Sequence, residues 1–283
     1  MSMTDYYRGH IGDMIGGFRS ALAQWEHDDS DLLRKLLMLT WDRLDRETRK
    51  QFSHLMINMI YRVSRSITAD RGTPTGEIMI LPFNFQGDEI DLDQTLDGKI
   101  ENPSLSYDNI FVLDRKKRRK AAVIIMDASG SMYGANLSMA AIAVTSLAMN
   151  LDLKDEYGVV FFSEKVNIFK HIDQKKHIDE VIKSVLDILP EGRTNIELGL
   201  SAGFQEIQRS SIADRIGILL TDGWQNIGRD PIALARRFPK LHVINLPGGS
   251  SKLSQKISKA GKGNYIMLKN IFDVPRAILQ CLN

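Results

Sequence analysis

The chain of 283 residues contains a single cysteine, Cys281, and eight prolines. One thiol cannot form an internal disulfide, so a packed core must stabilise the fold, and the sequence is typical of a reducing compartment. No apolar run approaches the roughly 20 residues that cross a membrane, and the first residues do not resemble a signal peptide. We therefore expect a cytoplasmic protein without membrane contact.

Catalytic and nucleotide-binding motifs are also missing. The sequence has no Gly-x-x-x-x-Gly-Lys-Ser/Thr phosphate loop, and no Gly-x-Gly-x-x-Gly follows an apolar strand. Ser131 lies in Gly-Ser-Met-Tyr-Gly, which differs from the Gly-x-Ser-x-Gly nucleophile elbow, and the six histidines lack zinc-motif spacing. We therefore expect no enzyme activity.

The chain has only a small excess of positive over negative charge. The formal net charge is +2, which gives no strong attraction to nucleic acid or lipid. Residues 115–120 carry six positive charges in succession, and an acidic cluster lies within 88–97. We interpret the acidic cluster as a solvated face and the basic run as a solvated lead-in to the next strand, with partner docking as the alternative for the basic run.

The N-terminal part is predicted to be helical. Apolar residues at helical spacing predict helices over 32–41 and 52–63, and a third helix is expected before Trp25. These helices suggest an N-terminal α-helical bundle. The predicted division is 1–75 for this bundle, 76–118 for a connecting segment packed on the main domain, and 119–283 for the main domain.

From Ala121 onward, apolar strands alternate with helical patterns. Strands are predicted over 121–126, 157–163, 165–170, 215–221, 241–246 and 264–268, with helices between them and a final helix from about 272. Such alternation builds a doubly wound, mostly parallel α/β sheet of the Rossmann type. One strand pair, 157–163 with 165–170, must be antiparallel because its connection is too short for a crossover.

Two buried strands are followed directly by aspartate. The run Asp127-Ala128-Ser129-Gly130-Ser131 follows the first strand, and its alternate side chains place three oxygens on one side of an extended chain. Asp222 follows the strand 215–221, and Thr194 lies in a polar loop between two helices. Sites in open α/β sheets gather at the carboxyl ends of strands. The predicted metal ligands are therefore Asp127, Ser129, Ser131, Thr194 and Asp222.

Oxygen ligands predict a hard cation, Mg²⁺ or Mn²⁺, with Ca²⁺ less favoured and Zn²⁺ disfavoured. The five positions, in this order, resemble the metal-ion-dependent adhesion site of von Willebrand factor A (VWA) domains. Arg193 departs from the pattern, since many members have glycine there. The resemblance implies a Rossmann-like VWA domain that captures an Asp or Glu carboxylate of a protein partner. Four neighbours are predicted to contact that partner: Met132, Tyr133, Arg193 and Trp224.

A second resemblance concerns the segment Asp91-Leu92-Asp93-Gln94-Thr95-Leu96, which lies about 30 residues before the metal motif. It is similar to the stretch before the VWA domain in CoxE-like proteins, the companions of MoxR-type AAA+ ATPases. This implies an adaptor for such an ATPase, in protein remodelling or metal-cofactor insertion. Two alternatives stay open: a chelatase-like enzyme subunit and a Ro-like RNA-binding protein. The short N-terminal part disfavours both, so we expect no nucleic-acid partner.

Overall fold

The computed structural model describes residues 46–65, 77–82, 89–101, 110–116, 119–132, 135–151 and 154–283. The expected helices at 32–41 and before Trp25 lie outside these ranges, so the N-terminal bundle stays a prediction. The helix predicted over 52–63 is present as α3 (Arg46–Arg65), which extends beyond the expected range at both ends.

The main domain is built on a six-stranded sheet with the order β6-β5-β4-β7-β8-β9. Its strands are β4 (Lys120–Asp127), β5 (Glu156–Phe162), β6 (Val166–Lys170), β7 (Asp214–Thr221), β8 (Leu241–Asn245) and β9 (Lys262–Met267). All neighbouring pairs are parallel except β5 with β6, which form the expected antiparallel hairpin. The prediction of a mostly parallel α/β sheet is confirmed.

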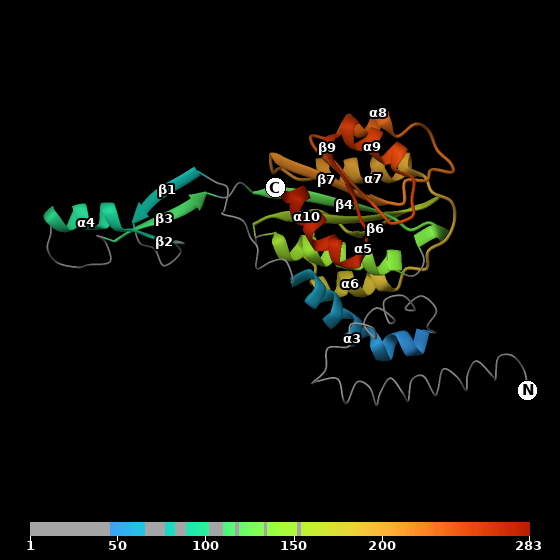
Figure 1. The fold of residues 1–283 in the computed structure, drawn as a ribbon, viewed down its shortest axis with the longest axis horizontal. Helices are drawn as coiled ribbons and strands as arrows, with labels where there is room; N and C mark the ends of the chain where they lie inside the picture. Colours follow the sequence, from blue (N-terminus) through green and yellow to red (C-terminus); the bar gives the residue numbers. More distant parts are fainter. Residues whose placement is uncertain are drawn as a thin grey trace, which may run out of the picture.

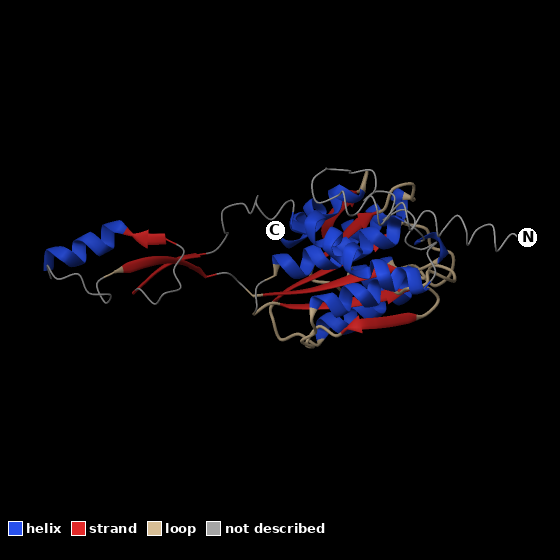
Figure 2. Cartoon of the chain, turned by 90° about the horizontal axis from the view of Figure 1, so that it is seen from below, coloured by secondary structure: helices blue, strands red, loops and turns tan. Residues whose placement is uncertain are grey.

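Helices cover both faces of this sheet (Figures 1 and 2). One face carries α3, α5 (Ala135–Asn150), α6 (Ile178–Leu186) and α10 (Val274–Leu282), and the other carries α7 (Ile196–Gln208), α8 (Ile232–Ala235) and α9 (Ser251–Ala260). Strand β4 supplies both cores, because alternate side chains point to opposite faces. Ile124 belongs to the first cluster of buried side chains, and Val123 and Ile125 belong to the second.

The chain changes direction across the sheet beside β4. From β4 it proceeds to β5 and β6 on one side, and it returns through α7 to β7 on the other side. This is a topological switch point, where loops that leave adjacent strands diverge and open a crevice at the carboxyl ends. Asp127 ends β4, and Asp222 follows β7, so both predicted carboxylates lie at this point.

A small unit precedes the main domain. It contains β1 (Glu77–Pro82), β2 (Glu89–Asp91), α4 (Leu92–Glu101) and β3 (Phe111–Lys116), with the antiparallel order β1-β3-β2. In Figure 1 these elements project away from the six-stranded sheet. The predicted domain division, including the packing of residues 76–118 on the main domain, stays a prediction.

Two short 3-10 turns, η4 (Gly130–Met132) and η5 (Ile271–Asp273), complete the main domain. The first follows β4 directly, and the second leads into α10. Within the described ranges, no helix combines the length and the apolar character that crossing a bilayer requires.

Candidate metal centre

Asp127 lies under the carboxyl edge of the sheet and is only 1% exposed. Its Oδ1 accepts a hydrogen bond from the backbone N–H of Ser129 (2.9 Å), and its Oδ2 accepts one from Thr221 Oγ1 (3.1 Å). Burial raises the pKa of the carboxyl from 3.8 to about 6; bonds from Ser129 and Thr221 oppose this shift, and nearby Asp222 adds to it. A cation close by would favour the charged form of this carboxyl.

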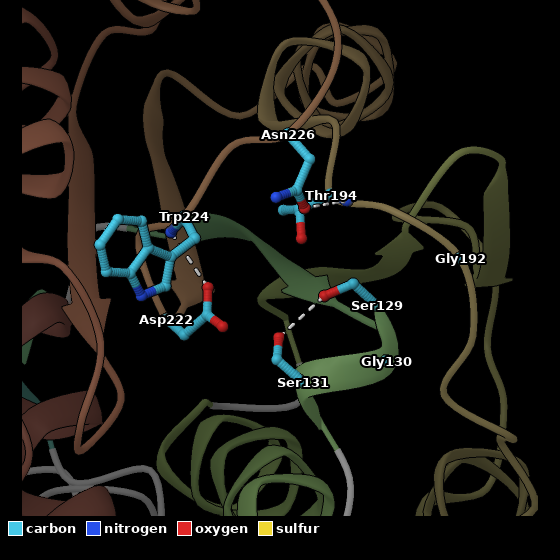
Figure 3. A pocket seen from close by; sticks show the side chains of 8 residues that line it. All are labelled: Ser129, Gly130, Ser131, Gly192, Thr194, Asp222, Trp224 and Asn226. Carbon is cyan, nitrogen blue, oxygen red and sulfur yellow. Dashed lines mark hydrogen bonds between the residues drawn. The ribbon is translucent and has the colours of Figure 1, made fainter.

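The turn after β4 presents two hydroxyls side by side. Ser129 Oγ and Ser131 Oγ are 3.1 Å apart, and η4 holds them in place because Met132 N–H donates to Ser129 O (2.9 Å). In Figure 3 both oxygens face the same open space. The alternate spacing of the two serines therefore does bring their oxygens together, although the local backbone is a turn.

A second loop, between α6 and α7, brings Thr194 to the same space. Its side chain is 2% exposed, and Asn226 brackets its backbone: Thr194 N–H donates to Asn226 Oδ1 (3.1 Å), and Asn226 N–H donates to Thr194 O (3.0 Å). The first and second loops are joined directly, since Gly130 N–H donates to Gly192 O (3.2 Å). This bonding fixes the Thr194 hydroxyl opposite the two serines (Figure 3).

Asp222, in the loop that follows β7, adds a carboxylate to the same space. Its Oδ1 accepts from Trp224 N–H (3.1 Å), and its backbone carbonyl accepts from Ser250 N–H (2.7 Å). A Cβ atom added at Gly249 would lie 2.0 Å from Asp222 O, so the loop before α9 can approach this closely only with glycine there. The carboxylate is thus positioned by two loops at once.

These side chains surround a pocket of about 290 Å³. It is lined by Ser129, Gly130, Ser131, Gly192, Thr194, Asp222, Trp224 and Asn226. Four of the five predicted ligands line it, and the fifth, Asp127, lies beneath and bonds to its floor through Ser129. All of the polar side chains that line it carry oxygen atoms, apart from the Trp224 ring, whose only polar atom is nitrogen. Hydroxyls and carboxylates fit a hard divalent cation, and no nitrogen–sulfur set for zinc is present there.

Among the described residues, no group of three or more His, Cys, Asp or Glu side chains is placed to hold a metal ion. A cation in this pocket would therefore depend on the hydroxyls of Ser129, Ser131 and Thr194, together with the two aspartates. Such a set neutralises a divalent ion without surrounding it with surplus negative charge.

The predicted partner contacts differ in their placement. Trp224 is 57% exposed at the mouth of the pocket. Arg193 is exposed too, and its Nε donates to Glu164 Oε1 (2.9 Å). Met132 is only 1% exposed because its side chain belongs to the core, so its predicted role as a partner contact is wrong. Tyr133 lies outside the described residues.

Two residues of this centre were not predicted from the sequence. Asn226 braces Thr194, and Thr221 bonds to Asp127. Thr221 and Asp127 are 94 positions apart, and no local pattern identifies such a long-range hydrogen bond.

Comparison with known proteins agrees with this geometry. Residues 122–225 match the family model described as von Willebrand factor type A domain. Inter-alpha-trypsin inhibitor heavy chain H3 of Bos taurus is 29% identical over 180 residues, which cover 57% of this chain and 20% of that protein. Uncharacterized protein sll0103 of Synechocystis sp. is 31% identical over 102 residues, which cover 35% of this chain and 24% of that protein.

The chain therefore spans a quarter or less of the length of these curated relatives. Among solved structures, the crystal structure of an aerotolerance-related membrane protein from Bacteroides fragilis is similar in fold. Its TM-score is 0.50 at 19% identity, over 58% of this chain and 98% of that chain. Residues 122–225 of the main domain thus match the VWA family model, and the mostly parallel sheet has the fold of that solved structure.

Proposed function

We propose that this protein is a divalent-cation-dependent interaction adaptor that binds an Asp or Glu carboxylate of a protein partner. VWA domains commonly mediate metal-dependent protein interactions and are typically not enzymes, so the proposed role is binding without catalysis. The observation that carries the proposal is the convergence of three hydroxyls and Asp222 on one open pocket. Buried Asp127 bonds to the backbone of one lining residue, Ser129.

The charge balance of the pocket explains why it would take a foreign carboxylate. Ser129, Ser131, Thr194, Asp127 and Asp222 would hold the ion, with Mg²⁺ or Mn²⁺ as the proposed cation. Two carboxylates neutralise a divalent charge but leave no excess, and a bound Mg²⁺ commonly keeps water or open positions. An acidic side chain can enter such a position, and the exposed ring of Trp224 provides an adjacent apolar contact.

The partner that we propose is a MoxR-type AAA+ ATPase, in protein remodelling or metal-cofactor insertion in the cytoplasm. The support is the resemblance of residues 91–96 to CoxE-like proteins and the presence of α3 ahead of the VWA domain. Segment 91–96 lies at the end of β2 and in α4, within the small projecting unit.

Titration calorimetry with Mn²⁺ and Mg²⁺ tests the metal site. Ser131→Ala removes an exposed hydroxyl whose only described side-chain partner is Ser129, so the fold should survive while cation affinity falls about tenfold or more, about 1.4 kcal/mol. Ser211→Ala, an exposed serine on a distant loop, is the matched control and should leave the affinity unchanged. Equal affinity in wild type, Ser131→Ala and Asp222→Asn would refute the metal site.

Affinity capture from native extract tests the partner. Wild-type protein with Mg²⁺ should retain an AAA+ ATPase, identified by mass spectrometry, and both chelator and Ser131→Ala should release it. Recovery of that ATPase at the same level in chelator would refute metal-dependent capture.

A further inference from the structure

Positive charge is concentrated in one part of the VWA domain. Between Asp230 and Asp273 the sequence contains no acidic residue and eight basic ones: Arg236, Arg237, Lys240, Lys252, Lys256, Lys259, Lys262 and Lys269. Since the whole chain has a formal charge of +2, this segment contributes +8 and the remainder contributes −6. The small net charge therefore conceals a strongly uneven distribution.

These cations lie at the surface around α8, α9 and β9. All are exposed except Lys240, which is half-buried. None of the eight forms an ion pair with a carboxylate in the described part of the chain; Arg237 instead lies 4.3 Å from the ring centre of Phe204. Helix α9 packs on β8 and β9, and α8 lies beside α9 (Figure 1). We call these eight residues the basic face.

Three lysines form a row along α9. Lys252, Lys256 and Lys259 are spaced by four and three residues, so they share one side of the helix and span about 10 Å along its axis. Their charges reinforce one another because no acidic side chain lies between them. Such a row produces a local positive potential that attracts an extended anion.

The row begins beside the metal pocket. Helix α9 starts at Ser251, directly after Ser250, whose N–H bonds to the carbonyl of Asp222 (2.7 Å). Because α9 connects the end of β8 to the start of β9, it runs from the carboxyl edge of the sheet to the opposite edge. The basic face thus leads away from the rim of the pocket.

We propose that the basic face is a docking surface for an acidic segment of the protein partner. The proposal rests on the proposed function, since the same partner would place one carboxylate in the metal pocket and further carboxylates along α9. A nucleic acid is disfavoured because α8, α9 and β9 bear no exposed aromatic side chain on which bases could stack, and Tyr265 of β9 is only partly exposed. The continuity with a pocket that suits carboxylates favours an acidic polypeptide.

Binding of fluorescent poly-L-glutamate to the full chain tests this surface. The variant Lys252→Gln/Lys256→Gln/Lys259→Gln removes the row, and Gln preserves helix propensity. The matched control, Lys165→Gln/Lys175→Gln/Lys183→Gln, removes three exposed lysines near β6 and α6; both variants lower the formal charge from +2 to −1.

We expect the α9 variant to bind poly-L-glutamate roughly tenfold more weakly in chelator, and the control to bind within about twofold of wild type. Equal weakening by both variants would show an effect of net charge alone and overturn the proposal. Tighter binding of polyuridylate, or of phosphatidylserine vesicles, than of poly-L-glutamate at equal salt would overturn it in favour of those partners.

Adding Mg²⁺ tests the metal site independently of the basic face. Mg²⁺ should strengthen binding of poly-L-glutamate to both lysine variants but not to Ser131→Ala. If Mg²⁺ has no effect while the α9 variant still binds weakly, the proposed function fails and the docking surface stands. If the Mg²⁺ effect is present and the two lysine variants behave alike, the docking surface fails and the metal function stands.

Discussion

At the scale of single residues, Thr221 bonds to one carboxylate of the candidate metal centre and to the loop that carries the other. Its hydroxyl is fully buried, donates to Asp127 Oδ2 and accepts from the N–H of Gly223 (3.1 Å each). The single proton of the hydroxyl is committed to Asp127, and its lone pair orients the loop that carries Asp222. Thr221 therefore positions both acidic groups without lining the pocket.

Replacing Thr221 with valine should show this role. The shape is retained, but a buried carboxylate loses its donor and a buried N–H loses its acceptor, which should lower the free energy of unfolding by about 1–3 kcal/mol. Mn²⁺ affinity should fall as well, by calorimetry. Thr221→Ser keeps the hydroxyl and should restore the affinity; Thr221→Ser as weak as Thr221→Val would show that the methyl group, not the hydroxyl, matters.

The residues of the candidate metal centre could be predicted from the sequence where their arrangement depends on neighbouring positions in the chain. The spacing of Ser129 and Ser131 is local, and the strands before Asp127 and Asp222 are apolar, so the sequence alone indicated where these side chains gather. Met132 was misplaced because the turn η4 rotates it into the core. A one-dimensional pattern does not specify on which side of a turn a side chain lies.

At the scale of elements, α7 packs unusually closely on the sheet. The loop that contains Thr194 leads directly into the N-terminal end of this helix. A Cβ atom at Gly199 would lie 2.4 Å from Phe162 Cδ1, and one at Gly203 would lie 2.2 Å from Ile125 Cδ1. Thr194 is two positions before the first residue of α7. The depth at which α7 packs therefore determines how far Thr194 reaches toward the serines.

Gly199→Ala should lower stability although alanine favours the helix. The gain in propensity is about 1 kcal/mol, whereas overpacking against the rigid Phe162 ring costs about 1–3 kcal/mol. Urea unfolding should show a net decrease in the free energy of unfolding. The affinity for Mn²⁺ should also fall, because Thr194 is displaced.

A second variant provides the control for this experiment. In a Phe162→Leu background, where the ring is absent, Gly199→Ala should cost clearly less than in the wild type. If Gly199→Ala raised the free energy of unfolding in the wild type, the close approach of α7 to β5 would be refuted.

The order of strands and helices in the main domain was predictable, because buried parallel strands and amphipathic helices have distinct periods. The helix within segment 89–101 was not, since the acidic residues of this segment predict only a solvated face. In the structure Asp91 Oδ1 accepts from the N–H groups of Asp93 and Gln94, so one of these acids caps α4.

At the scale of the whole molecule, cation binding should stabilise the domain, because only the folded chain assembles three loops into one site. A cation at 100 times its dissociation constant should add about 2.7 kcal/mol to the free energy of unfolding. Unfolding in Mn²⁺ and in chelator, with Ser131→Ala beside the wild type, measures this. Equal stabilisation of the Ser131→Ala variant at the same concentration would show that the ion binds elsewhere.

The buried His242 should make stability depend on pH. Its Nδ1 accepts from Asn264 N–H (3.0 Å), its Nε2 has no partner in the described structure, and burial, with Lys240 adding to it, lowers its pKa from 6.5 to about 4. A folded-state pKa below the unfolded one means that the unfolded chain binds more protons between these values. The contribution of His242 is therefore complete above pH 6.5 and is lost as the pH falls toward 4, up to about 3 kcal/mol.

Because Asp127 has a raised pKa, its contribution changes in the opposite sense over a similar range, so the wild-type curve alone does not isolate His242. His242→Asn retains an acceptor for Asn264 and removes the titration. The difference between the two curves of unfolding free energy against pH, both recorded in chelator, cancels the share of Asp127. That difference should fall by up to about 3 kcal/mol between pH 6.5 and 4; a constant difference would mean that His242 is protonated in the folded domain and is held by a contact other than the bond from Asn264.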